Sequence, residues 1–174
     1  MLASVLAMAL VVFLMFRPID EVPPPVVPEA AASFDRKLAG LMAGPGGTGE
    51  VAFAEQELNA KLAQTLTSAP SASPLKSIFV RLRPENRMTA VGLAEVMGRP
   101  VGGIAELRLV SEGGVSVTIE SARIGALPLP VGLFTQFVFP MMQSAGISPP
   151  TPSAMPATIK SARTDGANLI LSGR

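Results

Sequence analysis

The sequence predicts an α+β fold in which an N-terminal transmembrane helix precedes a curved antiparallel sheet of about six or seven strands, packed against two or three helices. Three observations predict it. Residues 1–16 are uninterrupted apolar or small residues. Residues 76–120 hold runs in which apolar and polar side chains alternate between short turns, as expected for strands with one solvated face. Residues 134–142 repeat apolar side chains at helical spacing.

Composition argues against several classes of function. The 174 residues include 14 Lys and Arg, 13 Asp and Glu, and no Cys or His. Nucleic-acid binding needs a concentrated basic face, whereas the arginines here are scattered singly, so we expect no nucleic-acid partner. Disulfide and thiolate chemistry need cysteine, and histidine is the usual general base and commonest metal ligand. We therefore expect no cofactor and no metal site.

Residues 1–17 are interpreted as a transmembrane anchor. A helix over the apolar run would span about 24 Å, slightly less than the roughly 30 Å hydrocarbon core of a bilayer. A cleaved signal peptide or a cytosolic core helix is the alternative, but the start lacks a basic residue and the exit lacks a small-x-small pattern. Arg17, after the run, favours a cytoplasmic body. The very short N-terminal tail is easily retained inside, which favours an extracytoplasmic one.

Residues 18–29 predict a stiff proline-rich spacer that lifts the remaining chain away from the membrane. A proline motif that binds a protein partner is the alternative interpretation. Residues 30–174 then form a single extracytoplasmic α+β domain. It begins with an amphipathic helix over residues 34–42, which a glycine-rich linker at residues 44–47 ends.

Residues 50–66 predict a short strand that continues as a helix. Phe53 and Leu58 have the spacing of a hydrophobic staple if Ala54 is the N-cap, with Glu57 then at the third helical position. Asn59 on this helix either hydrogen-bonds to a neighbouring strand or is solvated.

Four strands in succession, separated by turns at residues 84–87, 98–100 and 111–114, predict an antiparallel meander. One face is expected to be apolar, and the other to carry the arginines and glutamates. A cross-strand ion pair between Arg108 and Glu120 on the solvated face would contribute less than about 1 kcal/mol.

The chain from residue 127 predicts a turn, a helix and a hairpin. Residues 127–130, Leu-Pro-Leu-Pro, are expected to form a rigid turn into the apolar helix, which Pro140 should kink or end. A proline-rich connection covers residues 148–156. Asp165-Gly166 then predicts a two-residue type I′ loop in the last hairpin.

No set of residues predicts catalysis. Ser73 and Lys76 match a Ser-x-x-Lys pattern, but the serine precedes a proline and a strand instead of opening a helix. Carboxylates such as Glu95 and Glu120 lack a partnering base, nucleophile or metal. We therefore predict no catalytic residues and no enzyme.

A lipid or another apolar ligand is the ligand class that the sequence favours. The apolar helix and the turn before it would line a pocket against the sheet. A fully packed core made of the same side chains is the alternative. The candidate ligand-binding residues are Leu127, Leu129, Phe134, Phe137, Val138, Met141 and Met142.

Two motifs carry a resemblance to a known family, Glu57-Leu58-Asn59 and the run from Ser121 to Pro130, SARIGALPLP. With these motifs the chain resembles the YpmS-like family of bacterial single-pass membrane-anchored proteins, which look like distant relatives of tubular lipid-binding folds. The resemblance implies an extracytoplasmic domain, with lipid binding or envelope maintenance as its role and no catalytic residues. The chain departs from the family pattern at Ala54, where a Ser or Thr cap is common.

The sequence thus predicts a membrane-anchored cell-envelope domain that binds a lipid or another apolar ligand between sheet and helix. A non-enzymatic structural or interaction module with a packed core, which would bind an envelope protein, is the alternative. The expected partners are the membrane, which the N-terminal helix would span, and either a lipid ligand or an envelope protein.

Overall fold

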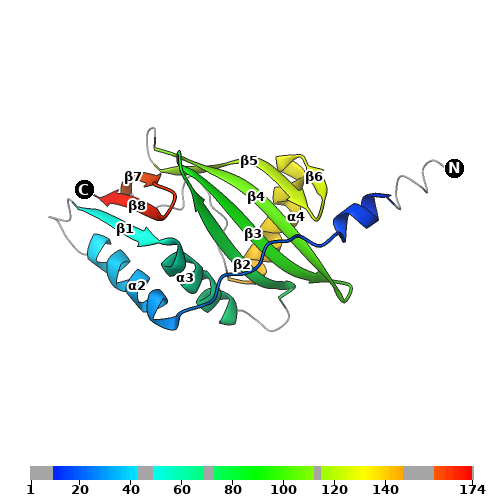
Figure 1. Cartoon of the computed structure of the whole chain (residues 1–174), viewed down its shortest axis with the longest axis horizontal. Helices are drawn as coiled ribbons and strands as arrows, with labels where there is room; N and C mark the ends of the chain where they lie inside the picture. The colour runs from blue at the N-terminus through cyan, green and yellow to red at the C-terminus, as the bar shows by residue number, and fades with distance from the viewer. Residues whose placement is uncertain (1–9, 43–48, 69–72, 112–114, 147–158, 174) are drawn as a thin grey trace.

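The computed structural model describes residues 10–42, 49–68, 73–111, 115–146 and 159–173, and shows two antiparallel sheets with helices packed against them (Figure 1). The larger sheet has the order β2 (Leu75–Arg83), β3 (Arg87–Val96), β4 (Arg99–Val110), β5 (Ser116–Ile124), β6 (Leu127–Leu129). The smaller has the order β1 (Glu50–Ala54), β8 (Asn168–Gly173), β7 (Ile159–Thr164). The helices are α2 (Pro28–Met42), α3 (Glu55–Thr67) and α4 (Val131–Ser144). The α+β prediction is confirmed, but the single curved sheet is replaced by two sheets.

Within the described residues, no helix has the length and apolar character needed to span a bilayer. Residues 10–15 are helical, and residues 1–9 lie outside the described part. The transmembrane helix therefore stays a prediction. The glycine-rich linker at residues 44–47 and the connection at residues 148–156 also lie outside the described residues.

Helix α3 begins where the sequence predicted. Ala54 is the N-cap, and the Glu57 carboxylate accepts a hydrogen bond of 2.9 Å from the Ala54 amide. Glu57 is only 7% exposed, and it also binds the Lys37 ammonium at 2.7 Å and the Ser33 hydroxyl at 2.5 Å. Burial alone would raise the pKa of Glu57, but hydrogen bonds from Lys37, Ser33 and the Ala54 amide together hold this pKa below its ordinary value. One carboxylate thus joins α2 to the start of α3.

Two side chains of α3 bind the open edge of strand β2. Asn59 donates to the Val80 carbonyl at 2.9 Å and accepts from the Val80 amide at 2.7 Å. One turn earlier, Glu55 accepts from the Leu82 amide at 2.8 Å. These are the backbone groups that an additional strand would bind, so α3 covers the edge of the larger sheet. Of the two alternatives left open for Asn59, the structure shows the hydrogen bonds to a strand.

A second connection joins the smaller sheet to the turn between β2 and β3. The Asn86 side chain accepts from the Thr164 amide at 3.1 Å, and the Thr164 hydroxyl donates to the Arg83 carbonyl at 2.5 Å. Ser111 exchanges hydrogen bonds with the backbone of Ala162 in β7. An apolar core fills the space between the two sheets and α2; its buried members are Leu41, Phe53, Leu82, Met88, Leu109, Val115, Ile159, Ala162 and Leu171.

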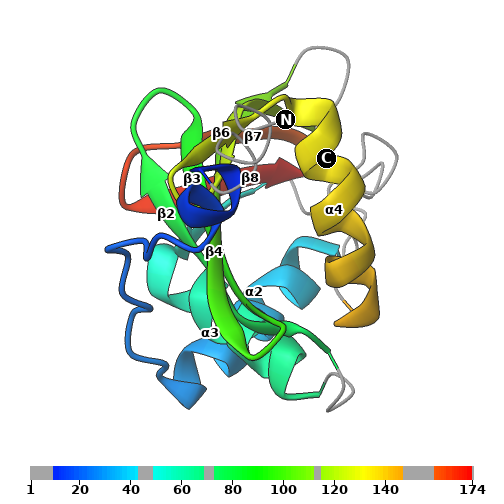
Figure 2. The same ribbon diagram turned by 90° about the vertical axis from the view of Figure 1, so that its right-hand side faces the viewer.

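The larger sheet is covered on both faces near the β3–β4 turn. Figure 2 shows α4 on one face and the N-terminal segment on the other. Ile19 packs against Phe79, Val91 and Ile104, which are buried side chains of the second face. This face was expected to be polar and residues 18–29 to be a spacer. In the structure the first half of that segment instead lies on the sheet, because three apolar residues there need cover.

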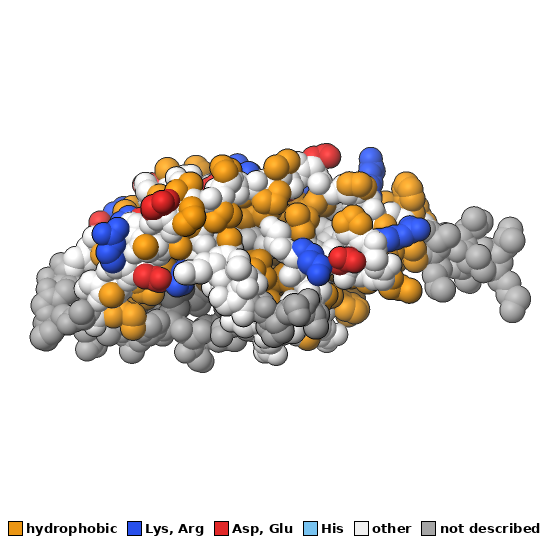
Figure 3. Space-filling model, turned by 90° about the horizontal axis from the view of Figure 1, so that it is seen from below, with side chains coloured by type: hydrophobic (Ala, Val, Ile, Leu, Met, Phe, Trp, Pro, Cys, Tyr) orange, Lys and Arg blue, Asp and Glu red, His pale blue; other side chains and the backbone are white. Residues whose placement is uncertain are grey.

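The remainder of the second face is polar, as predicted. The Arg108 guanidinium lies 3.5 Å from Glu120, and Arg87 lies 3.5 Å from the same carboxylate. Thr89 donates to Glu106 at 3.0 Å. A different side of the molecule, seen from below in Figure 3, also shows charges of both signs spread among apolar side chains and no basic patch.

Two local predictions near the C-terminus are wrong, and a third is wrong in one of its alternatives. Leu127–Leu129 forms the short edge strand β6 on β5 instead of a plain turn. Of the two effects expected of Pro140, ending the helix is excluded because α4 continues to Ser144, and a kink stays a prediction. In the last hairpin Asp165 pairs with Asn168, so Gly166 and Ala167 are the central residues, and only Gly166 has positive φ, at 96°. A type II′ loop has this pattern, because it needs positive φ at its first central residue only.

Replacing Asn59 with Ala should lower the free energy of unfolding by about 2–4 kcal/mol, because both Val80 backbone groups would lose their partner in a partly buried position. Chemical denaturation of the full chain in detergent measures it. Gln56→Ala, an exposed change on the same helix, is the control. Equal stability of the two variants would contradict the role of Asn59 as the partner of the β2 edge.

Glu57→Gln should lower stability at neutral pH by about 1–3 kcal/mol, because the charged hydrogen bonds to Lys37 and Ser33 are weakened. The folded-state pKa of Glu57 lies below its ordinary value of 4.5, so this contribution is present above that value and is lost as the pH falls through the folded-state pKa. The stabilities of wild type and variant should therefore converge in acid. Glu29→Gln, at an exposed carboxylate, is the control, and a constant difference between the wild type and Glu57→Gln at all pH values would refute this account.

Candidate apolar ligand site

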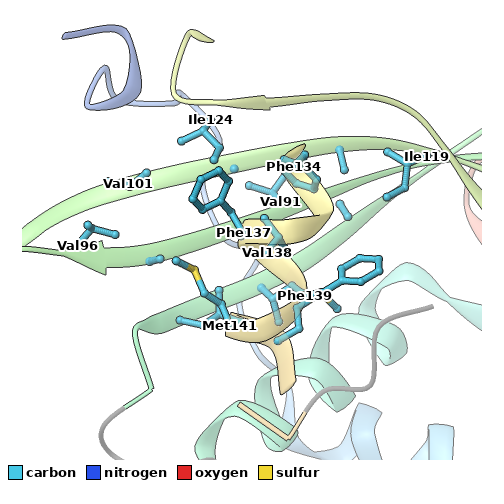
Figure 4. A pocket seen from close by; sticks show the side chains of 18 of the residues that line it. Val91, Val96, Val101, Ile119, Ile124, Phe134, Phe137, Val138, Phe139 and Met141 are labelled. Carbon is cyan, nitrogen blue, oxygen red and sulfur yellow. The ribbon is translucent and has the colours of Figure 1, made fainter. Parts of the chain in front are cut away.

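A cavity of about 130 Å³ lies between α4 and the inner face of the larger sheet (Figure 4). Its lining consists of apolar side chains and of glycines. The lining residues are Leu75, Ile78, Ala90, Val91, Gly92, Ala94, Val96, Val101, Gly103, Ala105, Leu107, Ile119, Ile124, Phe134, Phe137, Val138, Phe139, Met141 and Met142.

Small residues on the inner face of the sheet leave this space open. Ala90, Gly92 and Ala94 alternate along β3, so all three point to the same face. Gly103 and Ala105 on β4 are paired with Gly92 and Ala90 across the ladder. The centre of the sheet therefore presents hydrogen and methyl groups to α4, and the helix cannot fill the gap above them.

Helix α4 packs loosely over this floor. Phe134 is its one buried residue among the described positions, at 5% exposed, and it packs with Ala105 and Ala122. Phe137, one turn later, lines the cavity yet is 59% exposed. Leu133 is also exposed, at 46%. The helix is thus held at its start by Phe134 and at its end by Met142 and Ala145, which pack with Leu75, and the turn that carries Phe137 forms a partly open wall between them.

Five of the seven predicted ligand-binding residues line the cavity: Phe134, Phe137, Val138, Met141 and Met142. The other two do not. Leu129 packs beside the cavity against the cluster of Ala105, Ala122 and Phe134, and Leu127 lies half-buried in β6 opposite Ile124. Because residues 127–129 form a strand and not the expected turn, both leucines lie at the edge of the sheet and not in the lining of the cavity.

The sequence pattern identified the lining that α4 contributes but not the lining that the larger sheet contributes. The signal that could have found it is the run of small residues at alternating positions, Ala90, Gly92 and Ala94, in a strand where large β-branched residues are typical. Two such strands must also be neighbours before they open a cavity. That pairing becomes visible only in the fold.

The cavity contains no group for acid–base, nucleophilic or metal chemistry. Glu95 lies 3.9 Å from Lys76, and Glu120 lies between two arginines on the opposite face of the sheet. The Ser73 hydroxyl accepts a hydrogen bond from the Leu75 amide. No cluster of ligating side chains occurs in the part of the chain that the structure describes. What the arrangement can do is bind an apolar group by burying its surface.

Comparisons with known proteins identify no relative: no family model, no curated protein and no solved structure matches the chain. The resemblance to the YpmS-like family therefore stays a prediction.

Phe134 and Phe137 provide a matched pair of substitutions on one helix. Phe134→Ala should lower the free energy of unfolding by about 3–5 kcal/mol, because its buried ring holds α4 on the sheet. Phe137→Ala should lower it by less than about 1 kcal/mol, because most of that ring is already exposed. Denaturation of both variants in the same detergent measures the difference. Comparable losses would show that Phe137 belongs to a packed core and not to a cavity wall.

Proposed function

We propose that this chain is a membrane-anchored, non-enzymatic domain of the cell envelope that binds an apolar ligand between α4 and the larger sheet. The observation that carries the proposal is the cavity itself. Its lining is apolar throughout, and one of its walls, Phe137, is more than half exposed. Apolar surface of this kind gains free energy when hydrocarbon covers it and removes it from water.

The cavity volume limits the ligand class. An engineered cavity of about 150 Å³ with Leu, Ile and Phe walls binds benzene, and the cavity here measures about 130 Å³. That space accepts one ring or the end of one hydrocarbon chain. A whole two-chain lipid would have to leave most of its length outside the cavity. The ligand we propose is therefore the end of a single acyl or isoprenoid chain.

The proposed location rests on the N-terminal sequence. Residues 1–16 are apolar or small, and the exposed side chains of Leu10, Val12 and Phe13 need a non-aqueous environment. A helix extended over this run would nearly match the hydrocarbon thickness of a bilayer. We place the domain on the extracytoplasmic side, as the resemblance to the YpmS-like family implies.

A protein-interaction module of the envelope is the second candidate. The exposed Leu133 and Phe137 on α4 favour it, because a partner could cover both side chains. The two candidates differ in what fills the cavity. A ligand-binding domain holds a small apolar molecule there, whereas an interaction module needs none.

Native mass spectrometry of the full chain, expressed in bacteria and purified in a non-ionic detergent, tests the proposal. The wild type should carry a discrete added mass that differs from the detergent and is lost on organic extraction. Gly92→Leu should remove that mass and raise the melting temperature, because a leucine there extends from the sheet into the cavity and fills it. A Cβ at residue 92 would lie 3.6 Å from the nearest atom, a Leu75 methyl group, so its first atom fits.

Gly40→Leu is the matched control, because residue 40 is exposed on α2 with no atom within 4 Å of an added Cβ. It should retain the added mass. A wild-type chain that carries no added mass, or a Gly92→Leu variant that keeps it, would overturn ligand binding in this cavity. Capture of a protein partner would then be the experiment of choice.

A further inference from the structure

We propose that the end of the domain formed by the β3–β4 turn and the β5–β6 turn rests on the membrane surface. The N-terminal segment acts as a clamp that holds this end, and the part of the cavity nearest to it, at the bilayer. This inference rests on the proposed membrane anchor and ligand site. It adds the surface that faces the lipid and the residues that set the orientation.

The last turn of the N-terminal helix is bound directly to the β5–β6 turn. The Leu14 carbonyl accepts a hydrogen bond of 2.9 Å from the Ala126 amide. Gly125, next to it, has a φ of 57°, and a Cβ there would collide with the carbonyls of Leu14 and Met15. Only glycine permits both this backbone conformation and this close approach. The helix therefore enters the domain at one defined point.

The chain after the helix is fixed a second and a third time. Ile19 lies directly over Gly102 of β4, where any side chain on the strand would overlap it. Further along, the Arg81 guanidinium donates to the Val22 carbonyl at 3.2 Å. A segment bound at residues 14, 19 and 22 cannot act as a free tether. The direction of the helix therefore sets the orientation of the domain.

Part of the cavity lies at this same end of the molecule. Val96 and Val101, which line it, flank the β3–β4 turn, and Ile124 immediately precedes the β5–β6 turn. Figure 1 shows the N-terminal helix and the β3–β4 turn at one end of the molecule, with the smaller sheet at the other. An anchored helix would thus bring this part of the cavity close to the lipid.

The surface at this end suits a membrane interface. Met97, at the tip of the β3–β4 turn, is 94% exposed, the highest value among the exposed large apolar side chains of the described residues. Arg99 follows it, with its guanidinium 5.6 Å from the centre of the Phe16 ring. An exposed apolar tip beside an arginine that stacks on an aromatic ring can insert between lipids while the charge stays at the headgroups.

The absence of cysteine from the sequence makes a direct test available. Met97→Cys and Lys160→Cys each introduce one thiol for an environment-sensitive nitrobenzoxadiazole label. Residue 160 is exposed on β7, in the smaller sheet at the opposite end of the molecule. Each labelled full chain is reconstituted into vesicles of phosphatidylcholine with a minor fraction of phosphatidylglycerol. A nitroxide quencher sits in the upper acyl chain of part of the lipid.

The label at residue 97 should be blue-shifted and quenched several-fold more strongly than the label at residue 160. Equal quenching at both positions overturns the proposed orientation. The cavity is judged separately by the added mass and its loss in Gly92→Leu. A domain that binds its ligand but shows equal quenching would therefore refute this inference alone.

Gly102→Leu tests the clamp. The new side chain should displace Ile19 and itself cover Phe79, Val91 and Ile104, so the sheet keeps an apolar cover. Combined with Met97→Cys, it should reduce quenching at residue 97 toward the value at residue 160, while the melt stays cooperative. Quenching that persists unchanged in this variant overturns the clamp as the cause of the orientation.

Discussion

The open edge of strand β2 is the constraint on which the arrangement of the two sheets depends. A central sheet that ends in a long edge strand leaves backbone donors and acceptors that invite pairing with another chain. Here Asn59 and Glu55, one helical turn apart, take up those groups on Val80 and Leu82. Because α3 directly follows β1, this contact also positions the smaller sheet, which β1 shares with the C-terminal hairpin.

Helix α3 occupies the edge of the larger sheet, and α4 covers the face of that sheet near the β3–β4 turn. Because the residues on this face are small, their side chains do not fill the space beneath α4. Well-packed interiors leave few voids larger than a water molecule. A floor of Gly92, Gly103 and Ala105 beneath a helix with only Phe134 buried departs from that rule. Such departures cost stability and are expected where they serve a function, which is why the cavity carries the proposed function.

The opposite face shows how the N-terminal segment contributes to the fold. Phe79, Val91 and Ile104 form an apolar stripe within an otherwise charged face, and Ile19 covers it. Gly102 and Gly125 have no side chain at the two places where this segment approaches most closely. A loose tether would not need glycine at residue 102, whereas at residue 125 the positive φ of the turn also favours glycine. The segment is therefore part of the domain as well as its link to the proposed anchor.

The sequence by itself determined the local elements. Alternation predicted the four strands of the meander, and capping and staple positions predicted the start of α3, because these signals involve residues close together in the chain. The partner of Asn59, the strand β6, the type II′ loop and the docking of Ile19 were decided by the tertiary structure. So was the cavity, of which the sequence identified only the helical wall. Its floor depends on which small residues become neighbours across strands, and that pairing is set by distant contacts that no local pattern encodes.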